Sequence, residues 1–527
     1  MKKYLKNKVN STILALSVIV LFSCEAVLEE EPLNQIGTEF YYQNSSDALT
    51  ALTAAYAQLK NGVGYYRQQF LSNIYAASDQ GVSSWKHGNF RRGTIVLTDQ
   101  NLPNTWREIY IAIKDANNVI KYVPGITDMD DDLRNRVVGE ARFLRALHYF
   151  NLVRCFGEVP LRTEPVQPGD EGLPVSPISD IYQVIIDDLL FAANNCWTMG
   201  ETRGSYTNEI GRATKASAHA LLAKVYLRMA SSKRTANAGV QGNQRYLELP
   251  LTSDAYYQLA AEQCDFVVQQ PGHQLVSNLD DWKGLFDADN GNNPEMIFEI
   301  QGSSLTEQGT ALSNLFSPRQ AGLSGGGWGG TNRLQPRFIN NNIDKADLRF
   351  VNGVIHNYQD ANRTYVITPA LTGYRRTFTA TGAANGTLFV VFTSKYIDRN
   401  ATTEYTSQQN WHVVRLADVY LMRAEALAEL NQSPALAESD INTLRARVGM
   451  ANLSTSGMSM DDFRTAILRE RAAELFMEGH RFFDLTRMGV YDEYCKKVFG
   501  NTVGARQAED YVWPIPLIEV SANPNIN

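Results

Sequence analysis

The stretch Ile467–Gly489, ILRERAAELFMEGHRFFDLTRMG, carries the pattern that decides the fold of this 527-residue chain. Three carboxylates recur in it at every fourth residue: Glu470, Glu474 and Glu478. On a helix they form one acidic stripe, and like charges at this spacing destabilise an isolated helix by about 0.2–0.5 kcal/mol per pair. Because Phe463 and Ile467 project from nearly the same side, the stripe borders a buried face, where carboxylates need partners.

We expect arginines of the same stretch to supply those partners. Arg471 lies on the same predicted helix, and Arg481 and Arg487 follow Gly479 and flank Asp484. The pattern predicts a helix, a tight turn at the glycine and a second short helix, held together by bidentate pairs between arginines and carboxylates. Such a pattern indicates architecture rather than catalysis.

The same run closely resembles the signature of the SusD/RagB family of outer-membrane nutrient-binding lipoproteins. The positions that carry the resemblance are Glu470, Arg471, Glu474, Leu475, Phe476, Glu478, Gly479, Arg481, Asp484, Leu485, Arg487 and Gly489. Further matching segments follow in family order from Trp106 to Asn525, among them Glu140–Arg142, Arg415–Asp418 and Trp513–Pro516. The resemblance therefore covers nearly the whole mature chain.

The N-terminus has the form of a lipoprotein signal. Four lysines precede a short apolar run that ends in Leu-Phe-Ser-Cys, so we expect cleavage after residue 23 and a lipid on Cys24. An ordinary signal peptide with an incidental cysteine is the alternative. With a lipid on Cys24, residues 24–45 are the predicted anchor and tether. Within them, Glu29–Glu31 resemble a surface-export signal; the alternative is that they form a solvated spacer.

Charge restricts the classes of partner. The formal net charge of −7 becomes −7 − 4 = −11 once residues 1–23, with four lysines and no acid, are removed. An acidic surface disfavours nucleic acid and anionic lipid, so we expect attachment to the membrane through the lipid alone. No later segment holds 18 consecutive apolar residues.

The fold class predicted is mainly α, with a tetratricopeptide-like (TPR-like) scaffold of helix hairpins. Helical periodicity marks the ranges 46–59, 70–77, 104–123, 131–156, 179–196, 211–229, 254–269, 411–430 and 435–448. Trp106 and Arg142, and again Ile181 and Ser217, are 36 residues apart, close to the repeat of such hairpins. Residues 271–410 instead form a loop-rich lobe with short β-like runs, inserted between helical halves at 46–270 and 411–527 of a single SusD-like domain.

The sequence contains few patterns typical of an enzyme. It has no HExxH metal motif, no G-x-S-x-G elbow and no P-loop, so we expect no enzymatic activity, no metal and no cofactor. Asp287–Gly291 resembles a calcium loop only in part, and a polar turn explains it better. Four cysteines remain after Cys24, in no CxxC pair, and either disulfides or buried thiols would suit them: Cys155, Cys196, Cys264 and Cys495.

Two loops have the composition of a glycan-binding site, which needs aromatic platforms beside amides and charged groups. One loop holds Asp79, Trp85, Lys86, Asn89 and Arg91, and the other, residues 316–333, holds Trp328 among glycines. Ligand-contacting aromatics of the resembling family occupy similar regions. Packing into the core remains the alternative for either tryptophan.

The resemblance implies a surface lipoprotein of the outer membrane without catalytic activity. Such a protein captures oligosaccharides and passes them to a SusC-like TonB-dependent transporter. Two alternatives stay open: a RagB-like peptide-binding lipoprotein, which shares every scaffold feature, and a lipid-anchored glycoside hydrolase, whose paired carboxylates would be adjacent only in space.

Overall fold

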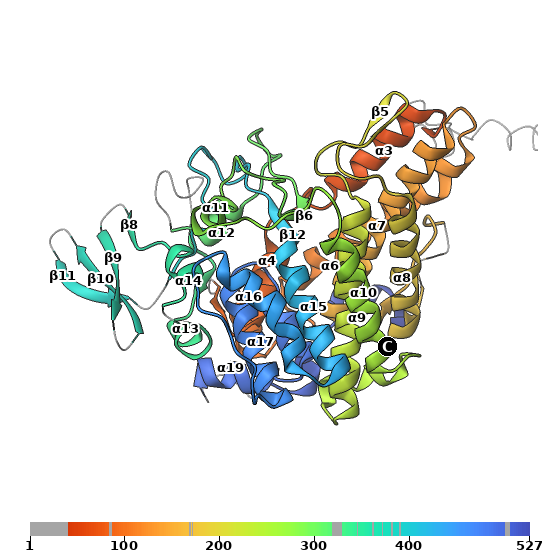
Figure 1. Cartoon of the computed structure of the whole chain (residues 1–527). Helices are drawn as coiled ribbons and strands as arrows, with labels where there is room; N and C mark the ends of the chain where they lie inside the picture. Colours follow the sequence, from red (N-terminus) through yellow and green to blue (C-terminus); the bar gives the residue numbers. More distant parts are fainter. Residues whose placement is uncertain are drawn as a thin grey trace, which may run out of the picture.

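A computed structural model describes residues 41–83, 87–167, 170, 172–318, 329–344, 346–360, 363–370, 373–380, 383–388, 391–500 and 506–526 (Figure 1). The predicted signal peptide and Cys24 lie outside this part of the chain. Most of the described chain is helical, as the sequence predicts. Within it, no helix is both long and apolar enough to cross a lipid bilayer.

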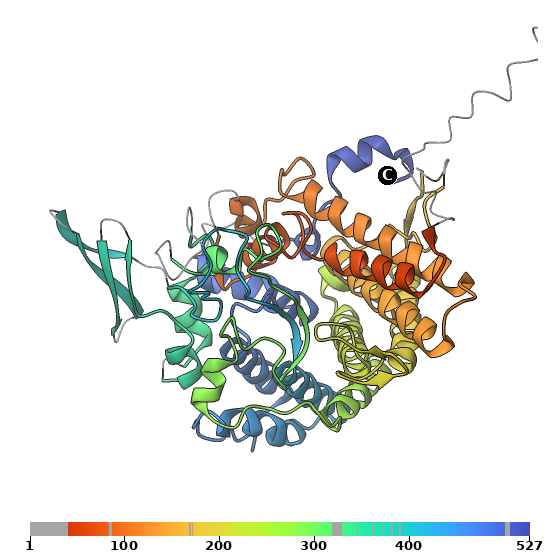
Figure 2. The ribbon, with the colours of Figure 1, turned by 90° about the horizontal axis from the view of Figure 1, so that it is seen from above.

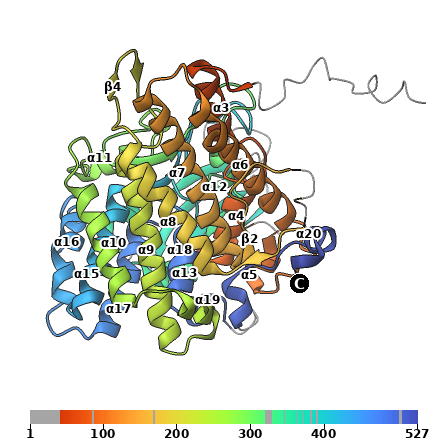
Figure 3. The ribbon, with the colours of Figure 1, turned by 90° about the vertical axis from the view of Figure 1, so that its right-hand side faces the viewer.

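The N-terminal half is a set of helices in which each packs on the next, except that the first lies against the third and fourth (Figure 3). Its members are α3 (Ser45–Ala57), α4 (Gln69–Ala77), α6 (Leu102–Tyr122), α7 (Asp131–Phe156), α8 (Ile178–Asn195), α9 (Lys215–Asn237) and α10 (Ser253–Val268). Side-chain caps explain several starts: Asn44 and Asp47 form a capping box on α3, and Thr214 caps α9. Periodicity predicts a start at Gly211, but α9 begins at Lys215 because Thr214 caps it there.

The C-terminal half continues this set of helices. It contains α15 (Leu416–Asn431), α16 (Glu438–Ala446), α17 (Met460–Glu474), α18 (Arg481–Arg487), α19 (Tyr491–Phe499) and α20 (Leu517–Ala522). Helix α10 packs on α15, so the two halves meet directly, and from above the helices follow one another along an arc (Figure 2). The predicted helix, turn and short helix of the signature are α17, the turn at Gly479 and α18, but α17 ends at Glu474, so Glu478 lies in the turn and not on the predicted helix.

One predicted helix start is wrong. Residues Trp411–Arg415 are not the first turn of a helix but strand β12, which pairs antiparallel with β6 (Met296–Ile300). All five residues of each strand are buried, and β-branched Val413 and Val414 suit a buried strand better than a helix start. This pair joins the middle lobe to the C-terminal half.

The lobe between the halves consists of short elements. They are α11 (Leu279–Gly284), α12 (Leu312–Phe316), β7 (Arg333–Leu334), α13 (Pro336–Asn342) and α14 (Leu348–Asn352). A four-stranded antiparallel sheet in the order β11-β10-β9-β8 projects from one side (Figure 1). Its strands are β8 (Asn357–Asp360), β9 (Arg363–Ala370), β10 (Gly373–Ala380) and β11 (Ala383–Leu388).

One connected set of buried apolar side chains runs through both halves and the lobe, from Ala48 in α3 to Trp513 near the C-terminus. The four cysteines Cys155, Cys196, Cys264 and Cys495 are buried in it as free thiols. Burial raises the pKa of each thiol, that of Cys155 and Cys495 to about 12. The disulfide that export would permit is therefore not formed among them.

Candidate functional site

The acidic stripe of α17 lies at the centre of a buried network of charges. Glu474 is fully buried and accepts hydrogen bonds from Arg415 at 2.8 Å and from Arg447 at 2.5 Å. Arg349 and the indole of Trp282 complete its partners, each at 3.2 Å. Burial alone would raise the pKa of Glu474, but the three guanidiniums outweigh it and hold the pKa well below its ordinary value.

The neighbouring carboxylates of the stripe are held in the same way. Glu470 lies 2.6 Å from Arg349 and 2.8 Å from Arg445. Glu478 lies 2.7 Å from Arg415 and 2.6 Å from Lys395, and these cations lower its pKa to about 2 against the effect of burial. Glu474 and Glu478, whose pKa values are lowered, stay ionised between cations and cannot protonate a leaving group, so they are unsuited to act as general acids.

The partners predicted for the stripe are wrong in detail. Arg471 binds Asp484 and Asp418, and Arg487 binds Asp484 and Glu425. The glutamates are instead paired with cations from distant segments: Arg349, Lys395, Arg415, Arg445 and Arg447. Arg349 and Lys395 come from the lobe, so the network connects the lobe to the helices. The spacing of residues within the signature alone cannot predict such long-range pairs.

Asp79 forms a second buried ion pair and is not exposed to a ligand. Its carboxylate is fully buried and pairs bidentately with Arg481, with both N–O distances at 2.9 Å. Asn342 accepts a further hydrogen bond from the same guanidinium. The sequence-based assignment of Asp79 to glycan binding is therefore wrong: its oxygens are already used to join α18 to the chain after α4.

Two residues after Asp79, a short antiparallel ladder brings the two predicted binding loops together. Strand β1 (Gly81–Val82) pairs with β7, with Gly81 opposite Leu334 and Val82 opposite Arg333. The segment with Trp85 and Lys86 follows β1, and the segment with Trp328 precedes β7. All three side chains lie outside the described residues, but the described ends of their loops are neighbours. We call the surroundings of this ladder the β1–β7 junction.

The β1–β7 junction holds buried polar atoms that have no partner in the described chain. Among the described residues, five side chains around it have a buried atom without a hydrogen-bond partner: Tyr75 Oη, Ser83 Oγ, Ser317 Oγ, Asn332 Oδ1 and Arg333 Nε. The Tyr75 ring lies against Phe316, with ring centroids 6.0 Å apart, and a Cβ on Gly81 would meet it at 2.0 Å. Each buried polar atom left unpaired costs about 1–3 kcal/mol, so the junction is suited to a ligand rich in hydroxyl groups.

Asn89 and Arg91 lie beyond the undescribed residues 84–86. They belong to a five-residue helix, α5 (Gly88–Arg92), where the sequence predicts a loop. The segment is helical because Phe90 packs edge-to-face on buried Trp513, with ring centroids 5.1 Å apart. The Asn89 amide donates to Asp99 at 3.0 Å and accepts from Arg92 at 2.8 Å. Both Asn89 and Arg91 are half-buried.

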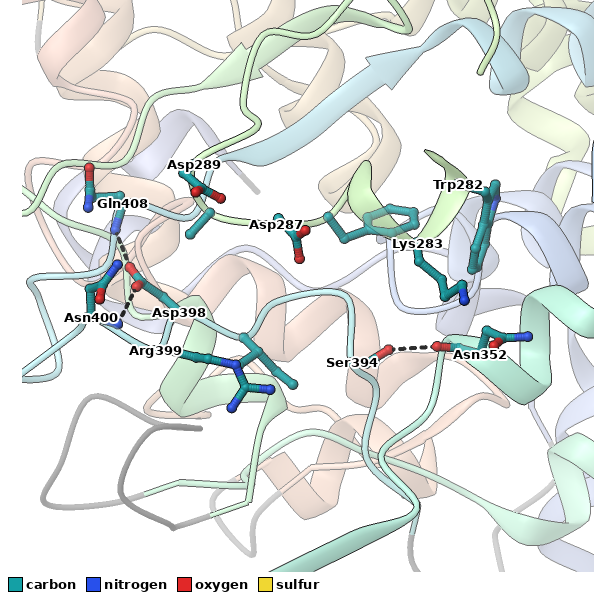
Figure 4. A pocket seen from close by; sticks show the side chains of 13 residues that line it. Trp282, Lys283, Asp287, Asp289, Asn352, Ser394, Asp398, Arg399, Asn400 and Gln408 are labelled. Carbon is teal, nitrogen blue, oxygen red and sulfur yellow. Dashed lines mark hydrogen bonds between the residues drawn. The ribbon is translucent and has the colours of Figure 1, made fainter. Parts of the chain in front are cut away.

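A separate cavity of about 530 Å³ opens within the lobe (Figure 4). Asp287, Asp289 and Arg399 face it, and Asp398 on its wall accepts hydrogen bonds from the backbone of Asn400 and Gln408. Burial and nearby Asp289 raise the pKa of Asp287. Among the described residues, no group of three or more His, Cys, Asp or Glu could hold a metal ion. Sequence reasoning missed this cavity because its walls come from segments over 100 residues apart.

The chain matches two family descriptions over most of its length. Residues 268–527 match the SusD family, and residues 27–227 match proteins described as starch-binding and associating with the outer membrane. The chain belongs to the SusD/RagB family. SusD-like protein P25 of Formosa agariphila is 26% identical over 95% of this chain and 94% of its own.

Two further relatives connect this SusD-like chain to proteins named for binding glycans. The starch-binding protein SusD of Bacteroides thetaiotaomicron is 24% identical over 100% of this chain and 98% of its own. The solved structure of a laminarin-binding SusD-like protein is 27% identical and superposes with a TM-score of 0.68, covering 92% of this chain and 98% of the other. The mainly helical fold predicted from the sequence is thus confirmed by homology and by structure.

Proposed function

We propose that this protein is a surface-exposed lipoprotein of the outer membrane, anchored by lipid on Cys24, that binds oligosaccharides without cleaving them. Its task would be to pass the captured glycan to a SusC-like TonB-dependent transporter. Relatives named for binding starch and laminarin support the ligand class, and the description of outer-membrane association supports the location. The lack of a free acid in the α17 stripe argues against hydrolysis there.

The observation that carries the proposal is the pairing of β1 with β7. It brings the ends of the Trp85 and Trp328 loops together beside five buried polar atoms that have no hydrogen-bond partner in the described part of the chain. A sugar ring presents an apolar face between hydroxyl edges, so indoles would stack on the face while the junction binds the edge. Lys86, Asn89 and Arg91 would complete the polar rim of this site.

Calorimetric titration of the mature protein against two panels tests the proposal. One panel contains neutral laminarin, starch and xyloglucan oligosaccharides, and the other contains peptides of mixed sequence. We expect binding to at least one oligosaccharide and none to peptides, with no new reducing ends after long incubation. Binding of peptides alone would support the RagB-like alternative, and released sugar would support a hydrolase.

A matched pair of variants assigns the binding to the loops. Trp85→Phe keeps an aromatic face, whereas Trp85→Ala removes it; we expect only the alanine variant to lose most of the affinity. Leu436→Ala, at a side chain that is 46% exposed in the C-terminal half, is the control for unspecific effects of a surface change. Equal affinity of all three variants would remove Trp85 from the site.

A further inference from the structure

Helix α6 carries a stripe of positive charge along its exposed face. Arg107, Ile111, Lys114 and Lys121 follow one another at spacings of three to seven residues, and all four are exposed. Residues at such spacings lie on one side of a helix. The nearest acids of Arg107 and Lys114 are the adjacent residues on the same helix at 4.0 and 3.4 Å.

Those adjacent acids are already bound elsewhere. Glu108 accepts hydrogen bonds from the backbone N–H groups of Gly64 and Tyr65 at 2.8 and 3.0 Å. Asp115 accepts from Gln58 at 2.8 Å. Lys121 pairs with Glu164 at 2.9 Å, so Arg107 and Lys114 are the cations of the stripe that are available to an acidic partner lying along α6.

An apolar groove of about 530 Å³ lies beside the stripe. It runs between α6 and the C-terminal helix α20, which Figure 3 shows on the same side of the molecule. Its apolar lining includes Trp106, Tyr110, Ile111, Val166, Ala522 and Ile526. Val166 is 52% exposed and Ile111 is 36% exposed. The groove is also lined by three cations and one acid: Arg107, Lys114, Arg162 and Glu519.

The described chain begins next to this helix. The Tyr42 ring stacks on Tyr122, at the C-terminal end of α6, with centroids 5.3 Å apart. Residues 25–40 precede it and contain five glutamates with no lysine, arginine or histidine. The apolar residues of this segment are Val27, Leu28, Leu33, Ile36 and Phe40. Its charge and its apolar content therefore complement those of the groove.

The segment before Tyr42 is long enough to reach the groove and the cations of α6. Eleven residues of α6 separate Tyr122 from Ile111, which is about 16 Å along the helix axis. Six residues separate Tyr42 from Ile36, enough to span about 20 Å when extended. Glu31, eleven residues before Tyr42, can reach about 36 Å, beyond the roughly 22 Å from Tyr122 to Arg107.

We propose that the segment 25–40 of this same chain is the occupant of the groove, lying parallel to α6. Leu33 and Ile36 would fill the apolar floor, and Glu29–Glu31 would face Arg107 and Lys114. The inference does not depend on glycan binding. Its consequence is that the tether is not a free spacer: a docked segment fixes which side of the molecule faces the membrane that holds Cys24.

Disulfide trapping in the lipidated mature protein tests this. Ile36→Cys is combined with Ile111→Cys in the groove or, as control, with Leu436→Cys, which is similarly exposed but lies in the 3-10 helix η4 (Pro434–Ala437) between α15 and α16. The four described native thiols are buried, so background is low. We expect an intramolecular disulfide to form at least about fivefold faster with Ile111→Cys than with the control.

Charge exchange makes the test specific. Arg107→Glu with Lys114→Glu should lower the trapping yield about fivefold, the effect of losing two exposed ion pairs. Adding Lys at positions 29–31 should restore it. Equal trapping at the control position, disulfides between two molecules, or loss of yield without restoration would each overturn the proposal and leave the groove to another partner.

Discussion

The network around Glu474 and the β1–β7 junction are both buried and polar, but they differ in whether their polar atoms are paired. Every carboxylate of the α17 stripe lies within 3.2 Å of at least two cations. At the junction, five buried polar atoms have no partner among the described residues. Paired groups hold a structure together, and we propose that the unpaired groups of the junction serve to bind the ligand.

The largest effect we expect is on the stability of the network. Arg415→Ala leaves Glu474 and Glu478 buried with too few cations, which should lower the free energy of unfolding by about 3–5 kcal/mol. Urea denaturation measures it. Arg203→Ala is the control: this arginine is 40% exposed and pairs with Glu201 and Asp132, so we expect a loss of at most about 1 kcal/mol. Similar losses for both would contradict the account.

The next effect concerns the second loop of the proposed site. Trp328→Ala should weaken binding of the best oligosaccharide by about 1–3 kcal/mol, by analogy with stacking of bases on aromatic side chains. Its urea midpoint should stay unchanged. A variant that loses stability but keeps affinity would place this indole in the core, which is the alternative that the sequence leaves open.

A smaller effect separates paired from unpaired hydroxyl groups. Tyr75→Phe removes a hydroxyl that has no partner in the described chain, so we expect unchanged stability and affinity weaker by about 0.5–1.5 kcal/mol. Tyr149→Phe is the matched control, since the Tyr149 hydroxyl donates to the Arg162 carbonyl at 2.7 Å. It should lose stability and keep affinity. The reverse pattern would show that the junction does not contact the ligand.

The smallest effect is a pH dependence of stability. Burial lowers the pKa of His148 to about 3, of His412 to about 4 and of His480 to about 3. The unfolded chain therefore binds more protons below pH 6.5, and stability falls as pH falls through this range. Below pH 4.5 the lowered pKa values of Glu474 and Glu478 add to the loss.

Glu299 opposes this trend over part of the range. Burial raises its pKa to about 7, so the folded state holds an extra proton between pH 4.5 and 7 and is favoured as pH falls. Burial also raises the pKa of Glu108, Asp188, Asp287 and Asp510 and lowers the pKa of His219 and His273. The large shifts of His148, His412 and His480 together exceed that of Glu299. We therefore expect melting temperatures to decrease from pH 6.5 to pH 3, most steeply below pH 4.5. A melting temperature that is constant from pH 6.5 to pH 4 would contradict the assignment of neutral buried histidines.

The sequence predicted local features better than long-range ones. Periodicity and capping residues located the helices, because both depend on residues within a few turns. The signature predicted that Glu470, Glu474 and Glu478 would need partners, but not that Arg349 and Lys395 of the lobe would supply two of them. Asp79 was misassigned for the same reason, since its partner Arg481 lies 402 residues further along the chain.

The candidate site was predicted only in part. Composition identified two loops with tryptophans, but only the β1–β7 register showed that their ends are adjacent. The unpaired atoms of Tyr75, Ser317 and Asn332 come from three separate segments, and no pattern in the sequence distinguishes them from packed polar residues. The helix α5 was missed because Phe90 is anchored by Trp513, a tertiary contact.

A crystal structure of the mature protein with its tightest-binding oligosaccharide tests the central claim most directly. We predict the sugar over the β1–β7 junction, with hydroxyl groups within about 3 Å of Tyr75 Oη and Arg333 Nε and a ring stacked on Trp85 or Trp328. A sugar bound only elsewhere, for example in the lobe cavity beside Asp287 and Arg399, with the junction unchanged, would contradict it.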